Sequence, residues 1–525
     1  MNKTKIMAIV GGVLTFILAI SAIIAVYRIR KLNVLPGKYM AALLIVLFVL
    51  LAGVIVSQFF NKFNILGDIF AALAIIGLIF AASAVGRVTK TLDGGMAAGD
   101  TKDTLVYIMV LKDSGYSSID SLKNATFGLC TEGAYADYNN QTVEMMKKDF
   151  GGEVYTRGYS SDFEVAVALT QKKVDAIIIS STQVAVVDDL FETQEEGSDY
   201  YLGAQENGEN TVLTDVATYV KTYTITEYVE KTPDADKQNK ELISTSVTPF
   251  VVYISGIDVR GDISTVSRSD VNIIMCVNPI TKQIAMVTTP RDSYVQFPGV
   301  TGNSYDKLTH AGIYGKECST SIATMEKLFG VKVDYYIKVN FTSVINIVEA
   351  LGGVTVHSDK DFVETSSGYH YHYAEGDNFL NGNQTLAFSR ERMAFADGDY
   401  QRGRNQLLAI QAILNKAMSP AILSAYSDIL TEVEKNFETN MEMSEITELV
   451  KMQIADNAQW NFISYSVAGI NNGVQQLRYT YSLGTTPLYV TILDEDSIAG
   501  ASDLMEIVLN GGTITQEQAN QLNIE

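Results

Sequence analysis

Residues 272–290 have the sequence NIIMCVN-PITK-QIAMVTTP, in which two apolar runs flank a short turn that contains proline. Apolar runs bounded in this way predict two strands joined as a hairpin. A further apolar run at 249–258, PFVVYISGID, predicts a strand immediately upstream. The segments 318–330 and 342–353 have Ser or Thr at their start and glycine at their end, which predicts two helices. Together these segments predict an α/β fold.

The pattern continues toward the C-terminus. Residues 405–420 form an amphipathic run, NQLLAIQAILNKAMSP, which predicts a helix stopped at Pro420. Further helices are expected near 421–435 and 443–457, and a strand is expected at 488–494. These elements predict a domain that covers residues 248–512.

A second alternation of strands and helices lies upstream, over residues 100–225. This layout resembles one lobe of a solute-binding protein and predicts a small α/β accessory or docking domain. The polar residues 226–247 predict a linker to the next domain. The expected strands are 104–113, 125–130, 174–180 and one near 212–225, and the expected helices lie near 134–149 and 160–173.

The N-terminus contains three apolar runs, at 6–27, about 40–60 and about 65–86. Each is long enough to span a bilayer, so residues 1–90 are predicted to be an anchor of three transmembrane helices. Three spans place the long C-terminal part on the opposite side from Met1. Taken alone, the positive-inside rule then predicts a cytoplasmic C-terminal part. The relevant charges are Lys3, Lys5 and Lys62 on the Met1 side and Arg28, Arg30, Lys31, Lys38, Arg87 and Lys90 on the other.

Charge also limits the expected partners of the chain, which has 525 residues and a formal net charge of −21. Non-specific nucleic-acid binding requires a broad basic face, so we expect no nucleic-acid partner. The three cysteines have no framework spacing and predict no disulfide scaffold. Beyond residue 100 there are nine arginines, and seven of them lie between Arg260 and Arg404. Because arginine suits the paired oxygens of phosphate, this concentration predicts one polyanion site.

The arginines are densest in FSRERMAFADGDYQRGRNQ, residues 388–406. Arg390 and Arg392 are two apart in AFSRER, which predicts a strand that turns both side chains to one face. Arg402 and Arg404 come just before or at the start of the following helix, where free N–H groups favour an anion. The alternative is a solvated charged loop, although surface ion pairs contribute less than about 1 kcal/mol. The partners in that loop would be Glu391, Asp397 and Asp399.

Two aspartates lie beside the predicted strands. Asp258 follows VVYIS, and Arg268 and Asp270 directly precede NIIMCVN. If the two carboxylates meet at one end of the sheet, they suit Mg²⁺ shared with a phosphate, with Mn²⁺ as a possible substitute. The alternative is that each aspartate caps a turn or a strand end.

Two further charged segments follow the hairpin. Arg291 and Asp292 lie in a Pro-Arg-Asp turn, where a surface ion pair is the alternative to a binding role. Lys307 and His310 lie in DKLTHAGIYG, and a lone histidine in this position is expected to be a structural hydrogen-bonding group.

Taken in order, these segments resemble the signatures of the LytR–CpsA–Psr family. The matching stretches within residues 255–420 are GIDVRGDISTVSRSDVNIIMCVN, TTPRDSYV, DKLTHAGIYG, DYYIKVNFTSVINIVEALGGV, LNGNQTLAFSRER and DGDYQRGRNQ. The resemblance implies an α/β catalytic domain with a central mixed sheet flanked by helices. The apolar N-terminus and the accessory domain are similar to those of the capsule-type CpsA members.

The resemblance also implies roles for individual residues. It implies Mg²⁺ at Asp258 and Asp270, and Asp399 is a candidate general base. Arg404 is a less secure ligand, because many family members have arginine where this chain has Asn405, and Arg260 is less secure still. The implied diphosphate ligands are Arg268, Arg291, Lys307, Arg390, Arg392, Arg402 and Arg404, and the implied catalytic set is Arg268, Arg291, Arg390, Arg392 and Asp399.

By resemblance, the protein is expected to be a membrane-anchored, extracytoplasmic phosphotransferase. It would move a glycopolymer, of capsular type, from an undecaprenyl-diphosphate carrier to peptidoglycan, with membrane lipid and capsule-synthesis membrane proteins as further partners. Two other functions stay open: a non-catalytic regulator that binds polyprenyl diphosphate, and a lipid pyrophosphatase.

Overall fold

We describe the protein from a computed structural model. It describes residues 3–32, 37–60, 64–94, 101–132, 136–192, 194, 196–205, 210–228, 245–257, 263, 266–365, 368–419, 429, 432–433, 436–483 and 487–522. The expected metal ligand Asp258, the neighbouring Arg260 and nearly all of the helix expected at 421–435 lie outside these residues. The same holds for most of the predicted linker.

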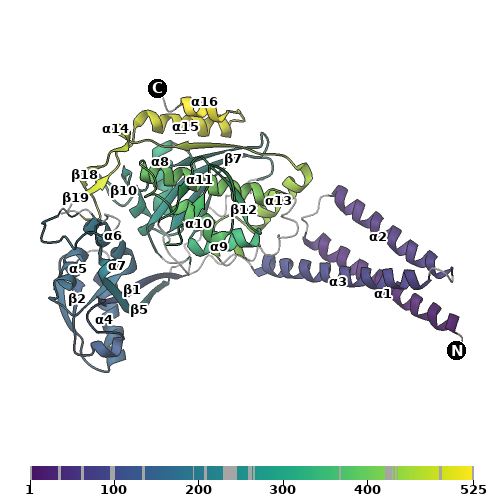
Figure 1. Ribbon diagram of the computed structural model, residues 1–525, viewed down its shortest axis with the longest axis horizontal. Helices are drawn as coiled ribbons and strands as arrows, with labels where there is room; N and C mark the ends of the chain where they lie inside the picture. The colour runs from purple at the N-terminus through teal and green to yellow at the C-terminus, as the bar shows by residue number, and fades with distance from the viewer. Residues whose placement is uncertain are drawn as a thin grey trace.

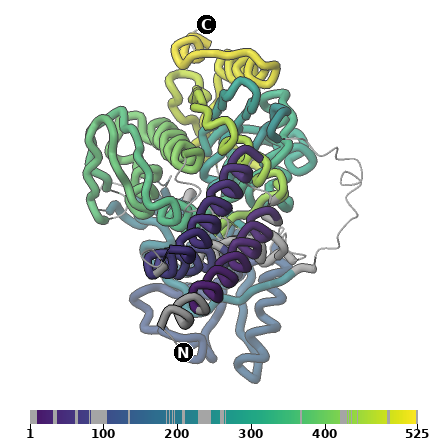
Figure 2. The backbone as a smooth tube through the Cα atoms, turned by 90° about the vertical axis from the view of Figure 1, so that its right-hand side faces the viewer, coloured from purple at the N-terminus to yellow at the C-terminus, as the bar shows by residue number. Residues whose placement is uncertain are grey.

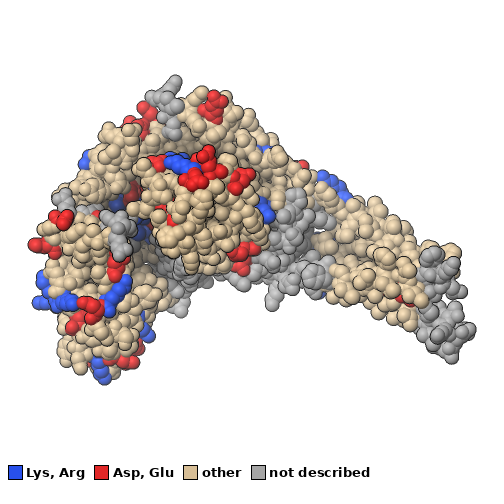
Figure 3. Space-filling model, in the orientation of Figure 1, with Lys and Arg blue, Asp and Glu red and all other residues tan. Residues whose placement is uncertain are grey.

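Three helices form the N-terminal part: α1 (Lys3–Leu32), α2 (Gly37–Gln58) and α3 (Asn64–Gly94) (Figures 1 and 2). In the described part of the chain, two stretches are long and apolar enough to cross a membrane, Val10–Arg30 and Gly37–Ser57. The prediction of three spans therefore needs correction, because the apolar stretch found in α3, Ile65–Ile79, is shorter than a crossing requires. Figure 3 shows few charged side chains on this bundle.

Residues 101–228, which we call the N-terminal lobe, contain a five-stranded sheet with the order β3-β2-β4-β1-β5. Helix α4 packs on one face, and α5 and α6 pack on the other. The strand expected near 212–225 begins later than predicted, because a short helix, α7, precedes it. The bounds are β1 (Thr101–Leu111), η1 (Ile119–Leu122), β2 (Thr126–Cys130), α4 (Ala136–Phe150), β3 (Tyr155–Tyr159), α5 (Asp162–Thr170), β4 (Ala176–Ser180), α6 (Ser181–Glu192), α7 (Leu213–Val216) and β5 (Ala217–Tyr228).

Residues 245–522, the C-terminal unit, contain a six-stranded sheet with the order β16-β11-β6-β7-β8-β17. The predicted hairpin is present, since β7 and β8 pair antiparallel. Strand β11 is parallel to β6 and β17 is parallel to β8, so the sheet is mixed, as expected. The bounds are β6 (Phe250–Ile257), β7 (Ser269–Asn278), β8 (Gln283–Thr288), β11 (Tyr335–Val339), β16 (Glu438–Thr439) and β17 (Asn461–Ser466).

Helices cover both faces of this sheet. Helices α8 (Ser319–Phe329) and α15 (Glu495–Leu509) pack on one face, and α11 (Gly398–Ala417) and α13 (Met443–Asp456) pack on the other. Helices α9 (Phe341–Ala350) and α10 (Gly382–Arg390) pack with α11 and the β12–β15 pair in a separate core. The smaller elements are β9 (Tyr294–Val295), β10 (Asp306–Lys307), η2 (Leu308–Ile313), β12 (Val354–Ser358), β13 (Phe362–Val363), β14 (His372–Tyr373), β15 (Gly376–Leu380), α14 (Ile470–Gly473), β18 (Gln476–Tyr479), β19 (Pro487–Val490) and α16 (Gln516–Gln521).

The helix starts differ slightly from the prediction. Cys318, in a left-handed conformation, precedes α8 without a side-chain cap. Asn340 caps α9, and its side chain accepts a hydrogen bond from the Ser343 N–H. Gly330 closes α8 with φ 68°, as its position predicts.

The lobe and the C-terminal unit are in contact. Leu190, in α6, is buried against Leu488 and Val490 of β19. Figure 1 shows the lobe beside the β18–β19 pair. The lobe therefore meets the C-terminal unit close to the end of the sheet at which the predicted arginines gather.

Candidate functional site

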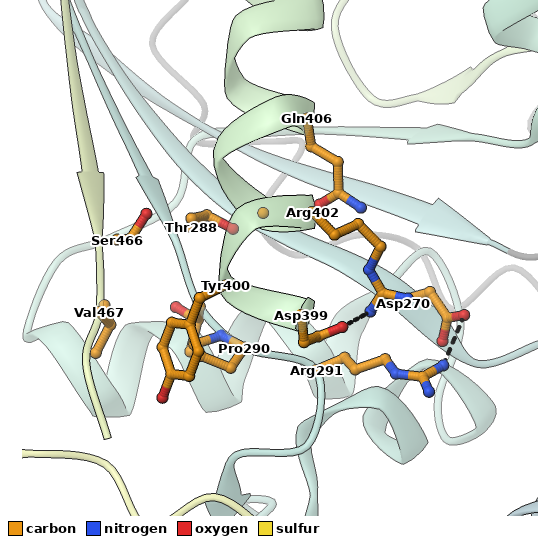
Figure 4. Close-up of a pocket in the computed structure, with 12 residues that line it drawn as sticks. Asp270, Thr288, Pro290, Arg291, Asp399, Tyr400, Arg402, Gln406, Ser466 and Val467 are labelled. Carbon is orange, nitrogen blue, oxygen red and sulfur yellow. Dashed lines mark hydrogen bonds and ion pairs between the residues drawn. The ribbon is translucent and has the colours of Figure 1, made fainter. Parts of the chain in front are cut away.

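The predicted charged residues from the hairpin and from α11 meet in a small inner pocket. It has a volume of about 20 Å³ and lies where β8 ends, between β17 and the first turns of α11 (Figure 4). Asp270, Arg291, Asp399 and Arg402 line it, and Tyr400 and Gln406 add polar groups. Charged groups that are distant in sequence thus come together, as the sequence predicted for a polyanion site.

Asp270 is the buried anion of this pocket. Arg291 Nη1 donates to its Oδ2 over 3.2 Å, and the Thr309 hydroxyl donates to its Oδ1 over 2.9 Å. Burial raises the pKa of Asp270, but the charges of Arg291, Arg268 and Arg402 outweigh burial and leave the pKa below its usual value. Asp270 is therefore a carboxylate in the folded protein and balances part of the cationic charge around it.

Arg402 lies in the second turn of α11, inside the helix and not ahead of it. The helix begins at Gly398, earlier than the sequence indicated. The Arg402 guanidinium pairs with Asp399, and its side chain is only 11% exposed. Burial lowers the pKa of Arg402, and Asp399 opposes that effect. An arginine held in this way is positioned before any ligand arrives.

Arg404 has different surroundings from Arg402. Its guanidinium pairs with Asp397 and donates to Gln401 Oε1, with 3.1 Å from Nε. It does not belong to the residues that line the inner pocket or the larger cleft described below. The structure thus separates Arg404 from Arg291, Lys307, Arg392 and Arg402, which line the pocket or the cleft.

Arg390 and Arg392 do not lie on a strand, so that prediction was wrong. The first four residues of AFSRER belong to α10, which starts at an Asn381–Gln384 capping box and ends at Arg390, and Arg392 follows the helix. The Arg390 guanidinium stacks on the ring of Phe341 at 4.2 Å. The buried Glu391 accepts hydrogen bonds from the backbone N–H groups of Thr365 and Ala394. Glu391 therefore anchors the loop after α10, a role that the solvated-loop alternative did not include.

A larger cleft of about 640 Å³ opens from the inner pocket. Arg291, Lys307 and Arg392 contribute its positive charge. Asp292 forms an ion pair with Lys307, 3.1 Å from Nζ to Oδ1, and its Oδ2 accepts a hydrogen bond from Gln475 Nε2 over 3.1 Å. The Pro-Arg-Asp turn is therefore part of the site, and Lys307, only 7% exposed, is more than a surface lysine.

His310 is structural, as expected. It is fully buried, and its Nδ1 lies 2.7 Å from Asp306 Oδ1. Asp306 also accepts a hydrogen bond from the backbone N–H of Ser482. This network fixes the β10–η2 segment, which carries Lys307 and Thr309 into the site.

A divalent cation was predicted at Asp258 and Asp270. Asp258 is outside the described residues, and no group of three or more His, Cys, Asp or Glu side chains in the described part could hold a metal. Asp270 alone fits the way Mg²⁺ is held by one or two carboxylates together with substrate oxygens. Its oxygens already bind Arg291 and Thr309, so a cation there would share the carboxylate with them.

Sequence reasoning missed several residues of the cleft. Tyr400, Gln475 and Tyr489 line it, as does Glu192 from the lobe. Tyr400 lies in the arginine-rich stretch and could have been singled out. Gln475 and Tyr489 come from segments without a charge pattern, Glu192 comes from an acidic stretch, and all three reach the cleft only through the tertiary fold.

Known proteins match this chain in sequence and in structure. Residues 216–486 match the LytR_cpsA_psr family. The polyisoprenyl-teichoic acid–peptidoglycan teichoic acid transferase TagU of Bacillus mycoides is 36% identical over 219 residues, 42% of this chain and 69% of TagU. TagU of Bacillus subtilis is 35% identical over 42% of this chain and 68% of its own length. The crystal structure of B. subtilis TagV aligns with a TM-score of 0.42 and 24% identity, over 51% of this chain and 99% of TagV.

Proposed function

Since the chain belongs to the LytR–CpsA–Psr family, we propose that it is a membrane-anchored phosphotransferase that moves a glycopolymer from a polyprenyl diphosphate to peptidoglycan. The observation that carries the proposal is the cluster of Arg291, Arg402, Lys307 and Arg392 along the inner pocket and the cleft, two cavities that share Arg291 and Asp399 in their lining. We assign the polymer to the capsular class, because the apolar anchor and the inserted lobe resemble the capsule-type members. Capsule-synthesis membrane proteins are the partners that fit this assignment.

The reaction in this proposal is a phosphoryl transfer governed by charge. An acceptor hydroxyl oxygen forms a bond to the phosphorus that carries the sugar. The bond from that phosphorus to the bridging oxygen breaks, and the bridging oxygen leaves with the polyprenyl monophosphate. Arg291 and Arg402 offer fixed positive charge where negative charge develops, and they need no rearrangement because Asp270 and Asp399 already hold them.

Asp399 is the residue we assign to accept the acceptor's proton. It lines both the inner pocket and the cleft, and its side chain is 29% exposed. A carboxylate that faces the cavity and is held by Arg402 can take a proton from a hydroxyl beside it. Arg268 and Arg390 support the site from outside the lining, Arg268 through its charge on Asp270 and Arg390 from its stacked position on Phe341.

A divalent cation also belongs to the proposal. Asp270 would hold Mg²⁺, or Mn²⁺ in its place, with Asp258 as the expected second ligand. Such a cation neutralises charge on the diphosphate oxygens when it is bound. The large part of the chain is assigned to the extracytoplasmic side of a multi-pass membrane protein, because peptidoglycan lies there.

The test uses the full chain in lipid nanodiscs with Mg²⁺ and a polyprenyl-diphosphate oligosaccharide. Loss of the lipid-linked glycan that depends on added peptidoglycan is the expected result. Release of lipid monophosphate without acceptor would identify a pyrophosphatase instead. Binding without either turnover would identify a regulator and would overturn the transferase assignment.

A further inference from the structure

The cleft has two chemically different walls. Arg291, Lys307 and Arg392 lie on the first, beside the inner pocket. The other described lining residues include Asn472, Gln475 and Tyr489, together with Glu192; none of these is basic, and we call them the second wall. The second wall therefore offers a diphosphate no positive charge.

The second wall is built from two separate parts of the fold. Asn471, Asn472 and Gly473 have left-handed backbone angles, with φ of 53°, 58° and 76°. This turn leaves the Asn471 and Asn472 side chains exposed rather than packed. Glu192 comes from the end of α6 in the N-terminal lobe, where its side chain is exposed.

The lobe is held in place at this wall by apolar contacts. In β19 the side chains alternate, so Leu488 and Val490 are fully buried against Leu190 of the lobe, while Tyr489 between them is 38% exposed and lines the cleft. Directly after β19, the Thr491 N–H donates to the Asp292 backbone carbonyl over 2.8 Å. The strand that carries the lobe contact is thus tied to the turn that carries Arg291.

Amide, carboxylate and tyrosine groups suit the hydroxyls and apolar faces of sugar rings. Amides both donate and accept hydrogen bonds, carboxylates accept them, and a tyrosine ring offers a flat apolar surface. The volume of about 640 Å³ falls in the range of about 300–1,000 Å³ that is usual for ligand sites, whereas the inner pocket holds only a few atoms. The sugar bonded to the diphosphate is the part of the donor that lies next to the cationic wall.

We propose that the N-terminal lobe completes the active-site cleft: Glu192, with Tyr489 and the Asn472–Gln475 turn, binds the first sugar residues of the lipid-linked donor and selects among glycans. This inference rests on the proposed function, because it places the diphosphate on the cationic wall. It gives the lobe a direct part in substrate recognition. A docking role alone does not require a lobe side chain in the cleft.

The test measures binding by the full chain in nanodiscs to two probes: a polyprenyl diphosphate that carries an oligosaccharide, and the same lipid diphosphate without sugar. Glu192→Gln and Tyr489→Ala should each weaken binding of the sugar-bearing lipid by about tenfold and leave binding of the bare lipid unchanged. Glu153→Gln and Tyr155→Ala are matched controls, since both residues are exposed on the lobe and do not line the cleft. The controls should bind both probes as the unchanged chain does.

The outcomes separate the two proposals. If the unchanged chain binds neither lipid, the proposed function fails. If it binds the bare lipid and the Glu192 and Tyr489 variants bind the sugar-bearing lipid normally, the lobe inference is overturned. An effect confined to the KM of the peptidoglycan acceptor would also overturn it, because the sugars bound would then belong to the acceptor. A loss of both probes in Glu192→Gln would show an indirect effect through the Asp292 turn, against a sugar contact.

Discussion

Arg402 and Arg404 are two residues apart in one helix, yet their surroundings differ. Arg402 is buried in the inner pocket with Asp399, whereas Arg404 is 37% exposed and pairs with Asp397. The arginine count along the sequence predicts a polyanion site, but it does not assign each arginine. Residues two apart in a helix point to nearly opposite sides, and the packing of α11 on the sheet decides which of the two arginines faces the pocket.

These two arginines give a matched test at the residue scale. Arg402→Ala should lower turnover by about 100-fold or more, because it removes a preorganised charge from the transition state. Arg404→Ala should lower turnover less than about threefold, because Arg404 lines neither the inner pocket nor the cleft. Steady-state rates on one lipid-linked donor measure both effects. Equal losses in the two variants would contradict the separation that the structure shows.

Asp162 in the lobe gives a pH-dependent prediction. Burial raises the pKa of Asp162 to about 7, and its buried Oδ1 has no hydrogen-bond partner. A raised folded-state pKa means that the proton on Asp162 stabilises the fold at low pH and that this stability is lost as pH rises through about 7. Asp162→Asn should therefore stabilise the lobe at pH 8 and have little effect at pH 4.

At pH 8 we expect Asp162→Asn to raise the stability of the lobe by roughly 1–2 kcal/mol, less than the full pKa shift of Asp162 implies. The gain is smaller because Asp162 lies in the first turn of α5, where the helix dipole favours a carboxylate. Hydrogen exchange of the α5 backbone amides, compared between variant and unchanged chain at each pH, measures this gain. If the α5 amides exchange equally slowly in the variant and the unchanged chain at pH 8, the ionised Asp162 does not destabilise the lobe, and the prediction fails.

At the scale of elements, the misassigned segment was AFSRER. A short segment does not distinguish strand from helix by periodicity alone. The spacing of two between Arg390 and Arg392 was therefore weak evidence for a strand. The better signal lay upstream, where Asn381 and Gln384 form a reciprocal capping box. By contrast, β6, β7 and β8 were predicted correctly, because a buried strand next to a proline-containing turn leaves few alternatives.

The left-handed turn of α14 gives a test at this scale. A Cβ on Gly473 would lie 2.4–2.7 Å from ring atoms and the hydroxyl of Tyr400, whereas a Cβ on Gly511 would meet nothing within 4 Å. Both glycines have positive φ, 76° and 83°, so an alanine is strained at either site. Gly511→Ala should cost about 1 kcal/mol of stability and leave turnover unchanged.

Gly473→Ala should cost about 1–3 kcal/mol more, because it also displaces Tyr400, and it should lower turnover beyond what the lost stability explains. Urea unfolding followed by the fluorescence of Trp460, the single tryptophan, measures the stability of both variants. If Gly473→Ala behaves as Gly511→Ala does, the turn has no influence on the cleft.

At the scale of the whole molecule, the number of membrane crossings decides how the loop charges are interpreted. Three crossings place Arg28, Arg30 and Lys38 on the same side as the C-terminal unit, against the positive-inside rule for an extracytoplasmic site. Two crossings, by α1 and α2, would separate those charges from the C-terminal unit, yet Lys38 Nζ donates to the Ala455 carbonyl of that unit over 2.6 Å. The apolar stretch found in α3 is short for a crossing, whereas this contact fits three crossings, so the crossings have to be counted by experiment.

Labelling of single cysteines in intact cells measures on which side of the membrane the C-terminal part lies and how many times the chain crosses the membrane. With Cys130, Cys276 and Cys318 replaced by serine or alanine, a cysteine at the exposed Glu153 of the lobe should react with a membrane-impermeant maleimide added outside, because a peptidoglycan-linked site must lie there. Labelling of Glu153→Cys only after lysis would place the site in the cytoplasm and remove the proposed acceptor. In the same cells, Arg30→Cys counts the crossings: protection from the outside reagent means two, and labelling means three, with α3 as the additional span.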